Sequence, residues 1–555
     1  MKRVQSKEWL WVAVFSVLVM ALTCVPFIVG AAHSGGDWRF SGFVFGVEDG
    51  NSYLAKMQLG AHGQWLFQLP YAIEDHPKSL TYLLYILLGK LAGWIVGTAD
   101  PLRLHTALVV TFHAARVIFG LGLLFASYRF LAEMLPFVRQ RRFGLIVVAL
   151  GGGLGWLSLV LGLPGTPLEF YSPEAFTFLD LYGLPHLAAA RIMFLLGLLW
   201  YLQAVKGRWP WMFAAGVAWF VMTLIQPLYM LIIFVLLGMH VAVLTVLSLQ
   251  QREGELTRGV DLGATAVRAL WMSAVAGAGG LPLVLYTFLL FTVDPVYQTW
   301  GGQNIILSPA PWHYVSAWGL LVVAGLFGFR TLYRRNILVW ALVVGWLVSL
   351  PVLLYIPNNL QRRFAEAAQL PLTALAVLGL TLGIFKIGRW KFGPPVRRYA
   401  VTALTALTLP ATVLLWAGGL AAASSPSEPV YQPRDQVAAY AFLARSLPPR
   451  ALVLSSYEFG NAVPAYGYLV AYVGHGPETP YLEYKLDTVN DFYSNATPNS
   501  DRFYSYSYLN SPYVVIGPHE HSLGRFDPSN PRQADYLVRI FQAGDYSVWS
   551  LKTSK

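Results

Sequence analysis

The sequence predicts a polytopic α-helical membrane protein that ends in a small α/β domain outside the membrane. Three observations indicate this class. Of the 555 residues, 56% are hydrophobic and only 12% are charged, whereas soluble domains contain about 25% charged residues. Several apolar stretches approach or exceed the roughly 20 residues that cross a bilayer. After residue 424 the composition changes, and helix-like and strand-like segments alternate.

The first apolar stretch is predicted to be a retained helix and not a signal peptide. It reads WLWVAVFSVLVMALTCVPFIVG and follows Lys2, Arg3 and Lys7. The stretch is longer than a secretory hydrophobic region and lacks an A-x-A cleavage site. Cys24 is the single cysteine, so neither an intrachain disulfide nor a cysteine metal site can form.

The basic residues predict the topology of the chain. They account for a formal charge of +11 and cluster in short connectors, which favours cytoplasmic loops over a nucleic-acid surface. If residues 79–97 crossed the membrane, the cluster RQRR at 139–142 would face outside. If they form an interfacial amphipathic helix instead, all the later basic connectors face the cytoplasm. We therefore predict a cytoplasmic N-terminus and a C-terminus outside the cytoplasmic membrane.

This arrangement gives about eleven spanning helices. The IQP sequence at 225–227 is interpreted as a turn between two of them, because proline removes a backbone donor. The predicted spans lie near residues 9–30, 105–132, 143–163, 185–205, 209–224, 227–249, 266–293, 313–330, 337–356, 370–387 and 399–420.

The segment SSPSEP is predicted to link a membrane domain, residues 1–424, to an extracytoplasmic α/β domain, residues 425–555. In the second domain we expect helices at RDQVAAYAFLARSL and PYLEYKLDTVNDFYS, and strands at ALVLSS, YVVIG and YSVWSL. The stretch YVGHGPETP at 472–480 is open to two interpretations. GHGPE could be a ligand loop, but a glycine-rich turn is the expected one.

With this topology, unusual polar residues gather on the outer side. Glu48 and Asp49 lie in the first outer loop, and Asp49 is surrounded by glycines and aromatic residues, where an ionised group is costly without a function. Arg362 and Arg363 lie in a late outer loop, against the positive-inside bias. An arginine pair at a membrane boundary suits an anionic group, and a phosphate is the natural candidate.

Two further arginines are expected inside the bundle. Arg116 lies one helical turn from His113 near the outer end of the second span, and Arg191 has a similar depth on the fourth. Each is either a substrate contact or an internal ion-pair partner of a loop carboxylate.

Three short motifs resemble those of the GT-C glycosyltransferases. They are VEDGNSYLAKM, the loop-to-helix junction EDHPKSLTYLLYILLGKLAG, and QRRFAEAAQLPL. The layout of residues 1–424 is most similar to bacterial members related to protein O-mannosyltransferases and lipid A aminoarabinose transferases. Lys78 replaces the second proline of the family's His-Pro-Pro pattern. Because the acidic pair reads Glu-Asp-Gly, either carboxylate could match the catalytic aspartate, and we assign that role to Asp49 first.

The resemblance implies transfer of a sugar from a polyprenyl-phosphate donor to an acceptor outside the cytoplasmic membrane, as an inverting hexosyl or pentosyl transfer. Asp49 is then the base, with Glu48 as the second catalytic carboxylate, and Arg362 or Arg363 binds the phosphate. The other predicted substrate-binding residues are His76, Lys78, Arg116, Glu174, His186 and Arg191. A divalent metal ion is left open as a cofactor. Its candidate ligands are Glu48, Asp49, Glu169 and Glu174, because hard cations prefer carboxylate oxygen.

Two other classes of function stay open from the sequence. A polytopic lipid or solute transporter, or flippase, could enclose a pathway between as many helices, although such proteins often have paired repeats and charges near the membrane centre. A non-catalytic membrane assembly factor could act through the outer domain with the same layout. The sequence identifies neither the sugar nor the acceptor, which could be protein, lipid or glycan.

Overall fold

The computed structural model describes residues 4–251, 257, 259–383 and 394–552. The chain divides into two compact units. Unit 1 comprises Met1–Cys24, Arg116–Phe288 and Ile305–Gly418, and unit 2 comprises Val25–Ala115, Leu289–Asn304 and Gly419–Lys555. Four helices have residues in both units. They are α1 (Ser6–Ala32), α4 (Pro101–Met134), α12 (Leu281–Val293) and α17 (Pro394–Ser424).

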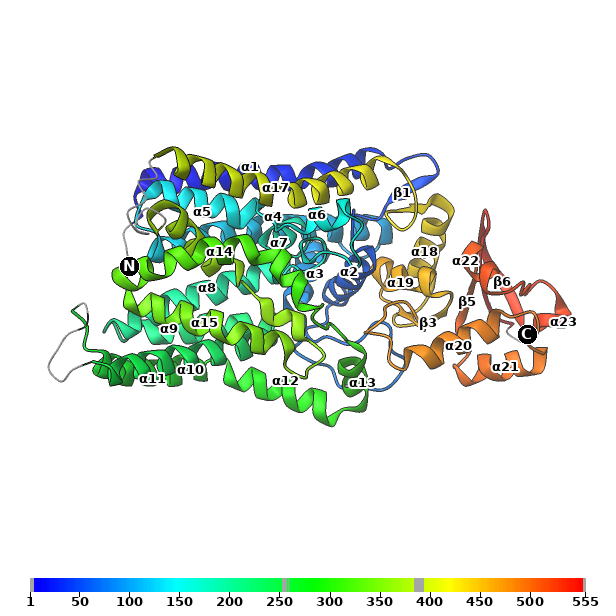
Figure 1. The fold of residues 1–555 in the computed structure, drawn as a ribbon. Helices are drawn as coiled ribbons and strands as arrows, with labels where there is room; N and C mark the ends of the chain where they lie inside the picture. The colour runs from blue at the N-terminus through cyan, green and yellow to red at the C-terminus, as the bar shows by residue number, and fades with distance from the viewer. Residues whose placement is uncertain (1–3, 252–256, 258, 384–393, 553–555) are drawn as a thin grey trace. The chain divides into compact units, whose positions relative to one another are not determined.

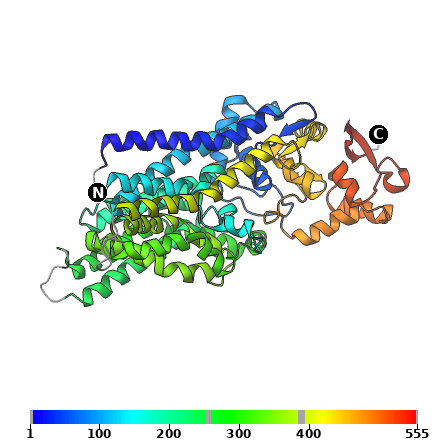
Figure 2. The same cartoon turned by 45° about the horizontal axis from the view of Figure 1, so that its top comes forward.

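Unit 1 is a helical bundle whose helices run alongside one another (Figure 1, Figure 2). Within it α8 packs against α9, α10 against α15, and α14 against α16. Its remaining elements are α5 (Val138–Leu150), α6 (Gly155–Val160), η1 (Leu168–Phe170), α7 (Thr177–Gly183), α8 (Pro185–Val205), α9 (Trp211–Ile225), α10 (Leu228–Leu249), α11 (Leu262–Ala278), α14 (Pro311–Arg335), α15 (Ile337–Tyr355), η2 (Gln361–Ala365), α16 (Gln369–Leu378) and the π-helical turn Gly379–Gly383.

The predicted class of a multi-pass membrane protein is confirmed. In the described part of the chain, nine helical stretches are long and apolar enough to cross a membrane, and the bent pair α11 and α12 makes a tenth. The 15-residue helix α9 occupies the predicted span 209–224. Gln226 and Pro227 separate α9 from α10, as the IQP turn predicts. For the predicted span 370–387, residues 384–387 lie outside the described residues.

The predicted interfacial segment 79–97 contains α3 (Leu83–Val96), which has 14 residues and is shorter than the roughly 20 that span a bilayer. One of its faces is buried in unit 2, while Leu87, Leu91, Trp94 and Ile95 are exposed. An apolar helix face left exposed in this way suits the lipid interface. Its placement there stays a prediction.

Unit 2 combines two earlier segments, Val25–Ala115 and Leu289–Asn304, with the C-terminal part of the chain. Its sheet has the strand order β4-β3-β5-β7-β6, with β3 parallel to β4 and β5, and β7 antiparallel to β5 and β6. Its elements are β1 (Trp38–Phe40), α2 (Val47–Ala61), α3, α13 (Pro295–Gln303), β2 (Tyr431–Pro433), α18 (Arg434–Ser446), β3 (Leu452–Leu454), α19 (Tyr457–Tyr466), β4 (Val470–Ala471), α20 (Leu482–Tyr493), α21 (Asn499–Tyr508), β5 (Tyr513–Ile516), α22 (Pro518–Leu523), α23 (Pro531–Ala534), β6 (Leu537–Ala543) and β7 (Tyr546–Leu551).

The predicted α/β character of the C-terminal region is confirmed. Each of the two expected helices and three expected strands coincides with an element of the structure: α18, α20, β3, β5 and β7. The sheet is covered by two clusters of buried apolar side chains, one of which includes Tyr71 from the first loop. A domain boundary near residue 424 stays a prediction.

Close backbone contact fixes the position of α2 in unit 2. A Cβ atom at Gly89 of α3 would lie 1.8 Å from the carbonyl oxygen of Met57, and one at Gly60 of α2 would lie 1.9 Å from that of Ile86. Glycine is therefore required at both positions, because any side chain would separate the two helices. This packing holds in place the helix whose first turn contains the acidic pair.

Candidate active site

The acidic pair Glu48 and Asp49 lies in the first turn of α2. Negative side chains are favoured there by the partial positive charge at a helix N-terminus. The side chain of Asp49 is 64% exposed. Asp49 therefore presents a carboxylate to solvent from a helix that is otherwise largely buried in unit 2.

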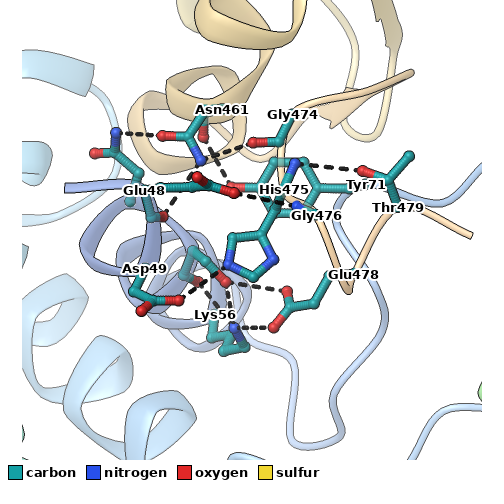
Figure 3. Close-up of polar contacts among 12 residues, drawn as sticks. Glu48, Asp49, Lys56, Tyr71, Asn461, Gly474, His475, Gly476, Glu478 and Thr479 are labelled. Carbon is teal, nitrogen blue, oxygen red and sulfur yellow. Dashed lines mark hydrogen bonds and ion pairs between the residues drawn. The ribbon is translucent and has the colours of Figure 1, made fainter. Parts of the chain in front are cut away.

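The loop of residues 472–480, which follows β4, contacts both carboxylates (Figure 3). Nε2 of His475 lies 3.2 Å from Oδ1 of Asp49. Oε1 of Glu48 accepts hydrogen bonds from the Gly476 N–H, at 3.1 Å, and from the hydroxyl of Tyr457. The acidic pair is therefore bound by a segment more than 400 residues away in the sequence.

A buried ion pair holds the same loop against α2. The ammonium group of Lys56 lies 2.7 Å from Oε1 of Glu478, and both side chains are almost fully buried. Ser52 donates to Glu478 at 3.0 Å and accepts from Lys56 at 2.5 Å. The rings of Tyr53, Phe67 and Tyr82 lie 4.1–5.9 Å from the Lys56 nitrogen. Both charges are thus paired and hydrogen-bonded, as burial requires.

The charges in this cluster shift one another's ionisation. Burial alone would lower the pKa of His475, but Glu478 and the hydrogen bond to Asp49 outweigh it, so the pKa is raised above its usual value of 6.5. Burial would raise the pKa of Glu478, yet Lys56 and His475 lower it below 4.5. Near neutral pH Glu478 is therefore ionised.

Asn461 of α19 connects the loop to α2 through its side-chain amide. It accepts from Asn51 at 2.8 Å and donates to the carbonyl of Gly474 at 2.7 Å. The backbone carbonyl of Asn461 accepts a hydrogen bond from the hydroxyl of Tyr71 at 2.8 Å. These neutral contacts fix the backbone on which His475 lies.

The sequence prediction did not include His475, Glu478, Lys56 or Tyr457. The stretch GHGPE was interpreted as a turn, and residues 476–478 do form one. The turn also contacts Glu48 and Asp49, while the ligand-loop alternative stays a prediction. The signal in the sequence that could have identified this loop was the presence of His475 and Glu478 beside two glycines.

His76 and Lys78 form hydrogen bonds within the segment between α2 and α3 to which they belong. Nε2 of His76 accepts the Leu69 N–H at 3.0 Å, and Nδ1 lies 2.7 Å from the carbonyl of Glu74. Burial lowers the pKa of His76, so the ring is neutral and shapes the loop. Lys78 is exposed and donates to Gln64 at 3.1 Å. A substrate role for either residue stays a prediction.

In unit 1, η2 presents Arg362 and Arg363 beside Glu174. The two Nε atoms lie 4.0 and 3.9 Å from the Glu174 carboxylate, which is beyond hydrogen-bond distance. Both Nε atoms are buried and have no hydrogen-bond partner among the described residues. The guanidinium of Arg362 also lies 4.6 Å from the centre of the Tyr171 ring. The pair thus retains donors that an anionic oxygen could satisfy.

Arg191 makes closer contacts in the same unit. It forms ion pairs with Asp180 at 2.6 Å and with Glu366 at 2.5 Å, and all three side chains are at most 1% exposed. Of the two sequence interpretations, these contacts favour the internal ion pair.

Arg116 is likewise buried, and it donates to the hydroxyl of Thr23, the carbonyl of Leu181 and the sulfur of Cys24. In the other unit, the ring of His113 lies 2.8 Å from the carbonyl of Gly42. His186 is partly buried at the start of α8.

The candidate metal ligands have other partners. Glu169 is buried and accepts the Gly155 N–H at 2.7 Å, and Glu174 faces the two arginines. Among the described residues, no group of three His, Cys, Asp or Glu side chains is arranged to bind a metal ion. The carboxylates near the acidic pair also have partners: Glu478 pairs with Lys56, Glu48 accepts from Gly476, and Asp49 lies beside His475. Metal binding stays a prediction.

Comparisons with known proteins identify the fold. No protein-family model matches the chain, and no curated protein matches it. The oligosaccharyltransferase of Archaeoglobus fulgidus, solved with a tethered acceptor peptide, is 12% identical, with a TM-score of 0.50 over 90% of this chain and 69% of that one.

Two more solved structures are similar. Archaeal oligosaccharyltransferase AglB from the same organism, in complex with an inhibitory peptide and a dolichol-phosphate, is 15% identical with a TM-score of 0.50, over 92% of this chain and 70% of that one. ArnT from Cupriavidus metallidurans matches at 13% identity over 97% of both chains, with a TM-score of 0.44. The predicted resemblance is confirmed at the level of fold, and this chain has the fold of the GT-C membrane glycosyltransferases.

Proposed function

We propose that this protein transfers a sugar from a polyprenyl-phosphate-linked donor to an acceptor at the outer face of the cytoplasmic membrane. The observation that supports this most is the exposed carboxylate of Asp49 in the first turn of α2, 3.2 Å from Nε2 of His475, in a protein with a GT-C fold. The dolichol-phosphate in one structure of similar fold supports a lipid phosphate as the donor's carrier.

The reaction needs a base for the acceptor and positive charge for the leaving group. Asp49 takes the proton of the acceptor hydroxyl while the oxygen of that hydroxyl forms a bond to the anomeric carbon of the sugar. The bond between that carbon and the phosphate oxygen breaks, and the polyprenyl phosphate leaves with the electron pair. A single displacement of this kind inverts the anomeric centre. Little acid catalysis is needed, because the departing phosphate is a weak base.

Arg362 and Arg363 are the proposed phosphate ligands. Their buried, unpartnered Nε atoms and their partial exposure, 18% and 26%, support binding of an anion that enters from outside. Two guanidinium groups can donate several charge-assisted hydrogen bonds to phosphate oxygens. They neutralise the charge that develops on the leaving group.

The test uses the full-length protein in lipid nanodiscs, with undecaprenyl phosphate carrying radiolabelled glucose, mannose, galactose, N-acetylglucosamine, xylose or arabinose as donor. Membranes of the source organism supply the acceptors. We expect transfer from at least one donor, and Asp49→Asn should lower kcat about 10²- to 10⁴-fold, because an amide cannot accept the proton.

Asp100→Asn is the matched control, since Asp100 is an exposed aspartate of the same unit that pairs with Arg445. It should leave transfer unchanged. Absence of turnover across all six donors would contradict the proposed function. Normal turnover by a folded Asp49→Asn variant would remove Asp49 from the role of base.

A further inference from the structure

We infer that His475, in the loop 472–480, is a positioning residue that orients the carboxylate of Asp49 for catalysis. The inference rests on the proposed function and extends it to a residue of the C-terminal region. It predicts that catalysis by a carboxylate near residue 50 depends on a side chain more than 400 residues later.

The first support is the contrast between the two side chains. The side chain of Asp49 is 64% exposed, whereas that of His475 is 7% exposed. An exposed carboxylate on its own samples several rotamers. A hydrogen bond to a fixed donor restricts it to one orientation, which favours reaction by reducing the entropy lost in the transition state.

The second support is that His475 is itself fixed. Its ring stacks on Tyr71, with centroids 5.7 Å apart and planes 24° apart. Its backbone N–H donates to Oγ1 of Thr479 at 3.3 Å, and its carbonyl accepts the Thr479 N–H at 2.8 Å. The donor that faces Asp49 therefore belongs to a compact, internally bonded turn.

The hydrogen-bonding partners indicate which ring nitrogen bears the proton. Nδ1 of His475 is buried and has no hydrogen-bond partner among the described residues. A proton on Nδ1 alone would leave a buried donor unpaired and two acceptors facing each other at Asp49, which is unfavourable. The Nε2–H form instead donates to Oδ1 of Asp49, as positioning requires.

The third support is the pattern of contacts along α2. Asp49, Ser52 and Lys56 have the spacing i, i+3 and i+7, which places them on one face of the helix. Asp49 contacts His475, and the other two contact Glu478. Figure 3 shows this face turned toward the loop. The loop thus contacts one face of the N-terminal part of α2, and the ion pair with Lys56 holds the loop against the helix beside the contact between His475 and Asp49.

The test compares His475→Ala with His475→Gln in the transfer assay with the best of the six donors. We expect His475→Ala to lower kcat about 10- to 100-fold, as loss of a partner that orients an active group commonly does. The KM for the donor should stay the same, because the inferred role of the imidazole is to orient Asp49 and not to bind the donor. Glutamine keeps an N–H donor of similar reach, so His475→Gln should recover most of the lost rate.

His62→Gln is the control, since His62 is a part-buried histidine of the same unit that stacks on Tyr468. It should retain full activity. Wild-type kcat in His475→Ala would overturn the inference, as would an equal loss in a folded His475→Gln variant. A parallel Asp49→Asn variant separates the two hypotheses. If it is inactive while His475→Ala is fully active, only the positioning role fails, whereas an active Asp49→Asn contradicts the assignment of the base.

Discussion

Arg191 and the pair Arg362 and Arg363 lie beside glutamates in the same unit, yet their surroundings differ in kind. Arg191 is fully buried and contacts two carboxylates at 2.5 and 2.6 Å. Its remaining donors reach the hydroxyl of Thr177 and the carbonyl of Pro173. Arg362 and Arg363 are partly exposed, and their nearest carboxylate, on Glu174, lies 3.9–4.0 Å away.

The comparison separates arginines that stabilise the fold from arginines that can bind a ligand. Where the protein itself supplies acceptors for each guanidinium nitrogen, as around Arg191, an incoming anion would have to displace a buried carboxylate. Where donors are left unmatched in a partly open place, an anion gains hydrogen bonds at little cost. From their positions in the sequence alone, Arg191 and the pair Arg362 and Arg363 were all candidates for substrate binding.

The largest effect is expected at Arg191. Arg191→Leu leaves the buried carboxylates of Asp180 and Glu366 without their cation, which typically costs on the order of 3–5 kcal/mol. Thermal unfolding in detergent should show a large loss of stability or of folded protein. Arg445→Leu, which breaks an exposed pair with Asp100, should change little. A stable, inactive Arg191→Leu variant would instead place Arg191 among the ligand-binding residues.

The next largest effect, on ligand binding, is expected at Arg362 and Arg363. Arg362→Ala and Arg363→Ala should each weaken binding of undecaprenyl phosphate about tenfold or more, because each removes a charge-assisted hydrogen bond. Stability should be unchanged. Binding is measured with undecaprenyl phosphate itself, so the identity of the sugar does not matter. Unchanged affinity in the double variant would contradict the assignment of the phosphate site.

The smallest effect is expected at Glu174. Glu174→Gln removes a negative charge near the proposed phosphate site, so the affinity for undecaprenyl phosphate should rise about two- to fivefold, as for a partly exposed charge pair. The matched change Glu366→Gln removes one of the carboxylates that pair with Arg191 and should lower stability without a rise in affinity. A loss of affinity in Glu174→Gln would mean that this carboxylate helps to bind the donor.

Much of the fold could be predicted because it depends on local patterns. Runs of apolar residues fix where helices form. Within the described residues, each of the eleven predicted spans overlaps one helix or two successive helices, although α9, with 15 residues, is shorter than a full span. The distribution of basic loops led to the interpretation of residues 79–97 as an interfacial helix that does not cross the membrane, and the helix found there, α3, has 14 residues. The helices and strands of the C-terminal sheet followed from alternation and turn residues.

The partners of the candidate site could not be predicted in the same way. Asp49 was identified because a carboxylate among glycines and aromatic residues is unusual in an apolar chain. Nothing local to Asp49 indicates His475, which is 426 positions away, and nothing local to Lys56 indicates Glu478. Nor could the sequence distinguish the buried, paired Arg191 from Arg362, because both are arginines near a predicted membrane boundary.

The sequence by itself determined that this is a multi-pass membrane protein, where its helices lie, and that the chain contains an unusual acidic pair and an unusual arginine pair. Composition and periodicity are enough for this, since they reflect the bilayer as a solvent. The tertiary structure alone decided that the loop 472–480 packs on one face of α2, so that a buried ion pair brings His475 to Asp49. Such a contact depends on long-range packing and charge pairing, which leave no periodic signal in the chain.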